Sequence, residues 1–158
     1  MVADFLCRHI ARIGDSLASF CESTDPQFRT WLTPTRGQNQ ARSVLDLIGE
    51  CASTNNYVAA LLTAEPGQVL ARDDFRCEPK NADDARHEIQ ASCSTLILAI
   101  RGFSDEDFER TYPHWRGDLS AELLVVGAYR NMCYHAGQIN FIQILSGDLE
   151  FHAPSSWY

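Results

Sequence analysis

Residues 134–148 read YHAGQINFIQILSGD, a helical pattern that places one histidine among apolar side chains. In steps of three and four residues, the same apolar stripe continues toward the N-terminus as far as Leu124. Ser120 is a typical N-cap residue because its hydroxyl can accept a hydrogen bond from the first turn, and Gly147 is a typical residue at a helix end. The stretch therefore predicts one long helix between these two residues, with His135 near its middle.

Three earlier segments show the same helical period. They cover residues 3–22, about 39–64 and 82–100, and the last of these can be capped by Asn81. Turn-forming dipeptides such as Asp25-Pro26 interrupt the pattern between them. We find no strand-like alternation, and we expect the acidic run DEDFE of the last connection to be a solvated loop. The sequence predicts an all-α fold, a four-helix bundle with long connections between helices 1 and 2, 2 and 3, and 3 and 4.

The chain has 158 residues, of which 45% are hydrophobic and 22% are charged, so we expect one globular domain over residues 1–158. Its net charge of −8 and the lack of a basic run argue against nucleic acid as a partner. No apolar stretch is long enough for a membrane span, and the N-terminal residues do not resemble a signal peptide. We therefore expect a soluble, cytoplasmic protein with no membrane partner.

The six cysteines stand far apart in the sequence and form no C-x-x-C pair, which is typical of reduced cysteines in the cytosol. Cys51 and Cys133 fall inside predicted helices, without a nearby cation or a helix N-terminus that would activate a thiolate. We expect both to pack as small apolar residues.

His135 has polar neighbours on its own helix face. Asn131 lies four residues before it and Gln138 three residues after it. Burying such groups without partners costs about 1–3 kcal/mol each, so the imidazole needs a partner. Glu50 flanks the apolar stripe of the second predicted helix and can supply that partner. The pair can form a structural hydrogen-bonded ion pair, or it can provide two ligands of one cation.

Two segments of this sequence resemble a known family. YHAGQINFIQILSGD is similar to the last helix of the DinB-like (YfiT-like) superfamily, whose motif is a histidine followed by x-Gly-Gln and an apolar helical run. SVLDLIGECASTNNYV is similar to the second helix of that superfamily. The resemblance implies a four-helix bundle with a divalent metal site. In the family pattern the second helix supplies one histidine, and the fourth helix supplies two that are four residues apart.

Matched to that pattern, His135 occupies the histidine position before x-Gly-Gln. Asn131 stands where the other histidine of the fourth helix would be, and Glu50 stands where the second-helix histidine would be. Glutamate is a competent ligand for Zn, Ni, Mn or Fe, but an asparagine oxygen is a weak one, so the implied site is degraded or retuned toward a harder ion. Three more residues are possible additional ligands: His9, His152 and Gln138.

The resemblance implies a metal-dependent hydrolase or a thiol-dependent transferase that acts on a small molecule, although no catalytic residue can be assigned. The alternative is a non-catalytic stress-response or ligand-binding bundle, in which the same residues form a hydrogen-bonded polar core. We expect a homodimer in either case. Tyr112, His114 and Trp115, which precede the last helix, either line the mouth of a pocket or cover the core. Gly137 suggests close packing of the last helix against a neighbour.

Overall fold

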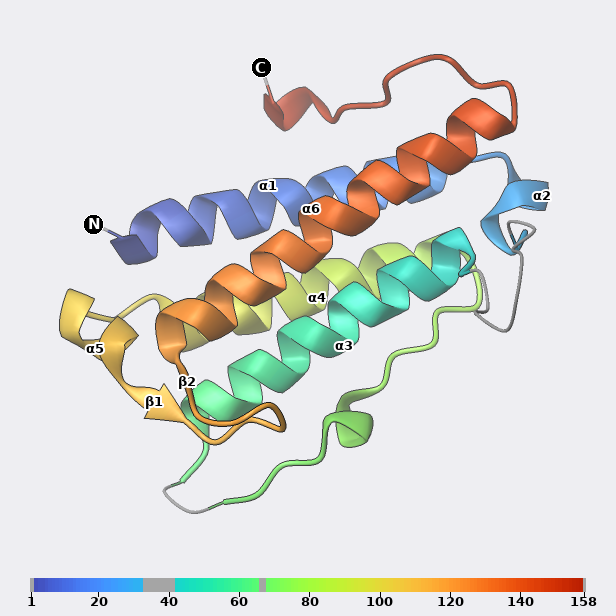
Figure 1. Ribbon diagram of the computed structural model, residues 1–158. Helices are drawn as coiled ribbons and strands as arrows, with labels where there is room; N and C mark the ends of the chain where they lie inside the picture. Colours follow the sequence, from blue (N-terminus) through green and yellow to red (C-terminus); the bar gives the residue numbers. More distant parts are fainter. Residues whose placement is uncertain (1, 33–41, 66–67, 158) are drawn as a thin grey trace.

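The computed structural model describes residues 2–32, 42–65 and 68–157, and four long helices within them pack as a bundle (Figure 1). This confirms the predicted fold class. In sequence order the four helices are α1 (Val2–Ser23), α3 (Val44–Thr63), α4 (Ala82–Ile100) and α6 (Ala121–Leu145). Each of α1 and α3 packs against both α4 and α6. The arrangement places the middle of α3 beside the middle of α6.

Helix α3 begins later than the sequence pattern predicts. Ser43 is its N-cap: the hydroxyl accepts a hydrogen bond from the Asp46 N–H, and the Asp46 carboxylate accepts one from the Ser43 N–H. This capping box fixes the helix start at Val44, and Arg42 precedes it in irregular structure. The rest of the predicted extension, residues 39–41, lies outside the described residues.

The connections and the segment after α6 contain short elements that the sequence pattern does not predict. They are α2 (Pro26–Arg29), η1 (Arg72–Phe75), α5 (Asp105–Glu109), β1 (Thr111–Tyr112), β2 (Leu119–Ser120) and η2 (Ser155–Trp157). The expected solvated loop DEDFE is α5, because Ser104 forms a capping box with Asp107 and Phe108 is buried. Strands β1 and β2 pair antiparallel, with Thr111 opposite Ser120, and at two residues each they are too short to show alternation.

Three of the cysteines belong to the core. Cys21, Cys51 and Cys93 are buried, and desolvation by burial raises the pKa of Cys93 to about 12. A thiol in such a setting stays protonated and packs as an apolar group, as predicted for Cys51. Cys133 is exposed on α6, so the prediction that it packs in the core was wrong. Because the sequence of α6 is apolar on several faces, it did not indicate that Cys133 lies on the outer side of the helix.

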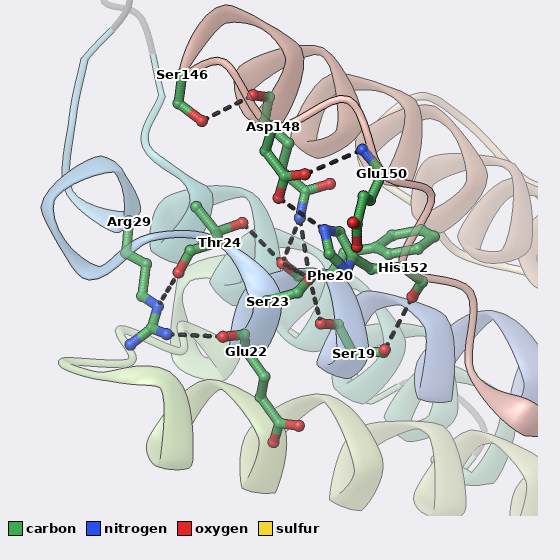
Figure 2. Close-up of polar contacts among 11 residues, drawn as sticks. Ser19, Phe20, Glu22, Ser23, Thr24, Arg29, Ser146, Asp148, Glu150 and His152 are labelled. Carbon is green, nitrogen blue, oxygen red and sulfur yellow. Dashed lines mark hydrogen bonds and ion pairs between the residues drawn. The ribbon is translucent and has the colours of Figure 1, made fainter.

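The C-terminal ends of α1 and α6 are joined by polar contacts (Figure 2). The Arg29 guanidinium of α2 donates hydrogen bonds to the carbonyls of Cys21 at 3.1 Å and Glu22 at 2.8 Å in the last turn of α1, and to that of Thr24, just after the helix, at 2.9 Å. The buried Gln143 of α6 donates to the Phe20 carbonyl at 3.0 Å. Arg29 thus satisfies carbonyls that a helix end leaves without an intrahelical partner, whereas the Phe20 carbonyl also accepts from the Thr24 N–H at 3.1 Å.

Arg29→Ala is expected to lower the free energy of unfolding by about 2 kcal/mol, because charged hydrogen bonds contribute about 1.5–3 kcal/mol. Chemical denaturation monitored by circular dichroism measures the change. The control is Arg110→Ala, which removes an exposed ion pair with Asp107 on the same helical turn. That pair should contribute less than about 1 kcal/mol. Equal losses in the two variants would show that Arg29 does not stabilise the end of α1.

The outer side of α6 carries exposed apolar side chains near its C-terminal end. Phe141, Ile144 and Leu145 are each about half exposed, at 56%, 53% and 49%. Such a surface is typical of an interaction face, and it agrees with the homodimer, which stays a prediction. None of the helices within the described ranges is long and apolar enough to cross a membrane.

Candidate functional site

The candidate site lies between the middles of α3 and α6, which run side by side (Figure 1). Glu50 of α3 faces His135 of α6, with Oε2 of the carboxylate 3.6 Å from Nε2 of the imidazole. Asn131, one turn earlier on α6, donates a hydrogen bond from Nδ2 to the same Nε2 at 3.1 Å. The structure thus brings together the three residues that the sequence analysis selected.

The imidazole of His135 is buried and oriented by its own helix. Only 3% of the residue is exposed, and Nδ1–H donates a hydrogen bond to Oε1 of Gln138 at 2.6 Å. Burial lowers the pKa of His135, the hydrogen bond to Gln138 opposes this shift, and Arg42 adds to it. At neutral pH the ring is therefore uncharged, and its Nε2 lone pair points toward Asn131 and Glu50.

Two arginines from the connections approach the Glu50 carboxylate. Arg42, just before the α3 cap, forms an ion pair with Oε2, and Nη2 of Arg72 lies 3.8 Å from Oε1. The side chains of Arg42 and Arg72 are 52% and 44% exposed, compared with 21% for Glu50. Sequence reasoning missed both arginines. Arg72 lies outside the periodic segments, and Arg42 falls in the predicted helix eight residues before Glu50, beyond the three- and four-residue spacing that pairs side chains on a helix.

Besides Oε2 of Glu50, which takes part in the ion pairs, two oxygen atoms near the site are buried without a hydrogen-bond partner, namely Oγ1 of Thr54 and Oδ1 of Asn131. Thr54 follows Glu50 by one helical turn and so shares its face of α3. Buried polar atoms are nearly always paired in folded proteins, because an unpaired one costs about 1–3 kcal/mol. The unpaired Oδ1 of Asn131, whose amide group contacts His135, is an atom that a ligand could satisfy.

The three possible additional ligands occupy different positions. Gln138 bonds to Nδ1 of His135 and so orients the ring from the side opposite to Nε2, which faces Glu50. His9 of α1 stacks on Phe5, with ring centroids 4.2 Å apart. His152, in the segment after α6, bonds to Asp148 through Nε2 at 2.7 Å, near the C-terminal end of α1 (Figure 2). Across residues 2–32, 42–65 and 68–157, no group of three His, Cys, Asp or Glu side chains is placed to hold a metal ion.

The aromatic residues before α6 lie against α3. The His114 ring is 5.9 Å from that of Tyr57 and 5.4 Å from that of Trp115, centroid to centroid. Trp115 is 59% exposed, and the guanidinium of Arg116 lies over it at 4.3 Å. Tyr112 packs against the core, which is the second of the two predicted roles, whereas a place of His114 and Trp115 at the mouth of a pocket stays a prediction.

The sequence matches no family model and no curated protein. The fold, however, is similar to solved structures. A DinB-like protein of Bacillus subtilis, YjoA, superposes with a TM-score of 0.65 at 10% identity, over 92% of this chain and 94% of that one. A conserved protein of Enterococcus faecalis superposes with a TM-score of 0.70 at 10% identity, over 93% and 98%. This chain therefore has the DinB-like fold.

Proposed function

We propose that this protein is a divalent-metal-dependent enzyme, a hydrolase or a thiol-dependent transferase, that acts on a small molecule. Glu50, His135 and Asn131 would hold the ion. The observation that carries the proposal is the distance of 3.6 Å between Nε2 of His135 and Oε2 of Glu50. Both atoms are electron-rich and come from opposing helices, and a cation between them would relieve their repulsion.

The chemistry of these residues suits a weakly held ion. The Gln138 hydrogen bond keeps the proton on Nδ1 and leaves Nε2 of His135 free to coordinate. Asn131 would offer its unpaired Oδ1 if its amide group turned over. One imidazole, one carboxylate and one amide oxygen favour Mn or Fe over a soft-ligand metal, and they bind Zn or Ni less tightly than three histidines would. A bound ion would lower the pKa of a water molecule or a thiol and so generate a nucleophile at neutral pH.

A second candidate function is supported by Arg42. Its guanidinium already neutralises Glu50, so the two helices can be joined without a metal ion. In that case Arg42, Glu50 and His135 form a polar core, and the protein is a non-catalytic ligand-binding or stress-response bundle. Arg42 is half exposed, so it can also leave Glu50 when an ion binds.

Metal content and thermal stability distinguish these candidates. The protein is purified without affinity metals, analysed for metals, and melted with a chelator and then with Mn²⁺ or Zn²⁺. Under the first proposal we expect close to one ion per chain and a stability gain of about 2.7 kcal/mol at a hundred times the Kd. Glu50→Gln should abolish the gain. A melting temperature that no ion changes would support the non-catalytic bundle.

A further inference from the structure

The two oxygens of the Glu50 carboxylate have different neighbours. Oε2 is buried, lies 3.6 Å from Nε2 of His135 and forms the ion pair with Arg42. Oε1 lies 3.8 Å from Nη2 of Arg72. The two arginines therefore approach one carboxylate at different oxygens, and only Arg42 contacts the oxygen that faces His135.

Arg42 and a bound ion would need the same atom. An ion held by His135 and Glu50 would use Oε2, because this is the carboxylate oxygen that faces the imidazole. Two positive charges on one buried oxygen repel each other strongly, since a partly buried site screens charges poorly. The ion and the Arg42 ion pair therefore oppose each other, whereas Arg72 can stay at Oε1.

Arg42 can leave Glu50 without disturbing α3. It precedes the helix in irregular structure, and its side chain is half exposed. The start of α3 is held by the capping box of Ser43 and Asp46, which does not involve Arg42. Its departure therefore breaks the ion pair but no hydrogen bond of the helix, and water can hydrate the released guanidinium.

In the ion-free protein the same contact has a structural role. Oε2 of Glu50 would otherwise face the lone pair of the neutral His135 ring in a buried place, and an uncompensated buried charge is strongly destabilising. The guanidinium of Arg42 supplies the missing positive charge. The bundle can thus remain folded while the site is empty.

We propose that Arg42 is a built-in competitor of the metal ion: it occupies Oε2 of Glu50 in the ion-free protein and is displaced into solvent when a divalent ion binds. Arg42 thereby lowers the affinity of the site for the ion. This describes the regulation of the proposed metal site, and it rests on the proposed function for the presence of an ion.

Titration of metal-free protein with Mn²⁺ and Zn²⁺, followed by calorimetry, tests the proposal. Arg42→Gln should tighten ion binding about tenfold, because the ion no longer has to break a charged contact. Arg42→Met is a second neutral variant and should behave in the same way. Arg42→Lys keeps the charge and should stay within about threefold of the wild type. The matched control is Arg72→Gln, which removes the guanidinium at Oε1 and should also change the affinity by less than about threefold.

Thermal unfolding provides a second readout that requires no enzymatic activity. In chelator, Arg42→Gln should melt below the wild type, because Glu50 has lost its counter-ion. In saturating Mn²⁺ this difference should disappear, because the ion then supplies the positive charge in both proteins.

The outcomes separate this proposal from the proposed function. If the wild type binds an ion and Arg42→Gln binds it no more tightly, Arg42 is not a competitor and the proposed function stands. The same conclusion follows if Arg42→Lys or Arg72→Gln tightens binding as much as Arg42→Gln, or if the melting difference persists in Mn²⁺. If neither the wild type nor Arg42→Gln binds an ion, both proposals fail. Ion binding by Arg42→Gln alone would support the competition.

Discussion

Replacing Gly49 with alanine is expected to destabilise the protein by about 3 kcal/mol, at the top of the usual range for overpacking. A Cβ atom at this position would lie 2.6 Å from the backbone oxygen of Cys77 and 2.9 Å from Cδ of Pro79. Neither atom belongs to a flexible side chain, so the connection after η1 has to move away from α3. The intrinsic helix preference of alanine offsets only about 1 kcal/mol of this loss.

Thermal unfolding measures the effect, which should be a decrease of roughly 6–12 °C in Tm for a domain of this size. The matched control is Gly137→Ala on α6. Gly137 is exposed, and a Cβ added there would meet no atom within 4 Å. This variant should gain up to about 1 kcal/mol from helix propensity. If Gly49→Ala unfolds at or above the wild-type temperature, the contact between α3 and the Cys77 segment is not as close as described.

Gly49 also shows where sequence reasoning reaches its limit. Both glycines stand inside helical patterns, and the sequence suggested that Gly137 was the one that packs closely against a neighbour. In the structure Gly137 is exposed and Gly49 makes the close contact. From the sequence, a glycine in a helix shows only that no side chain is present at that position. Which glycine faces a neighbouring segment depends on how the irregular connections pack.

The long helices and the facing pair of Glu50 and His135 could be predicted from the sequence. Periodic burial assigns a side chain to the inside of a helix, and antiparallel packing brings the middles of two such helices together. The arginines at Glu50 could not be predicted in this way. Arg72 belongs to a connection that is held in place by tertiary contacts, such as the hydrogen bond from the Cys77 N–H to Oγ of Ser53 at 2.8 Å.

Thr54 was missed for a different reason. A threonine inside a helix usually bonds to the carbonyl of the preceding turn, so the sequence alone marks it as ordinary. Only the three-dimensional structure shows that its Oγ1 has no hydrogen-bond partner. The helical period of the sequence predicts which residues are buried, but it does not predict which of them lack a hydrogen-bond partner.

His135→Ala is expected to weaken divalent-ion binding by more than hundredfold. Mutation of residues that merely orient a ligand already costs tenfold to hundredfold in metal affinity, and His135 is the only imidazole that faces Glu50 in the described part of the chain. Isothermal titration with Mn²⁺ and Zn²⁺ measures the change. Glu50 keeps Arg42 as a partner in this variant, so the fold should survive with a loss of about 1–3 kcal/mol.

Two further variants decide whether the effect comes from coordination. His9→Ala removes an imidazole that stacks on Phe5 of α1, and it should leave ion binding unchanged. Asn131→His places a second imidazole one helical turn from His135, where Asn131 already reaches Nε2 at 3.1 Å. It should tighten Zn²⁺ binding at least tenfold, because a borderline-soft ion prefers nitrogen to an amide oxygen. If His135→Ala binds ions as well as the wild type and Asn131→His gains nothing, then Arg42 is the permanent counter-ion of Glu50 and the polar core serves stability alone.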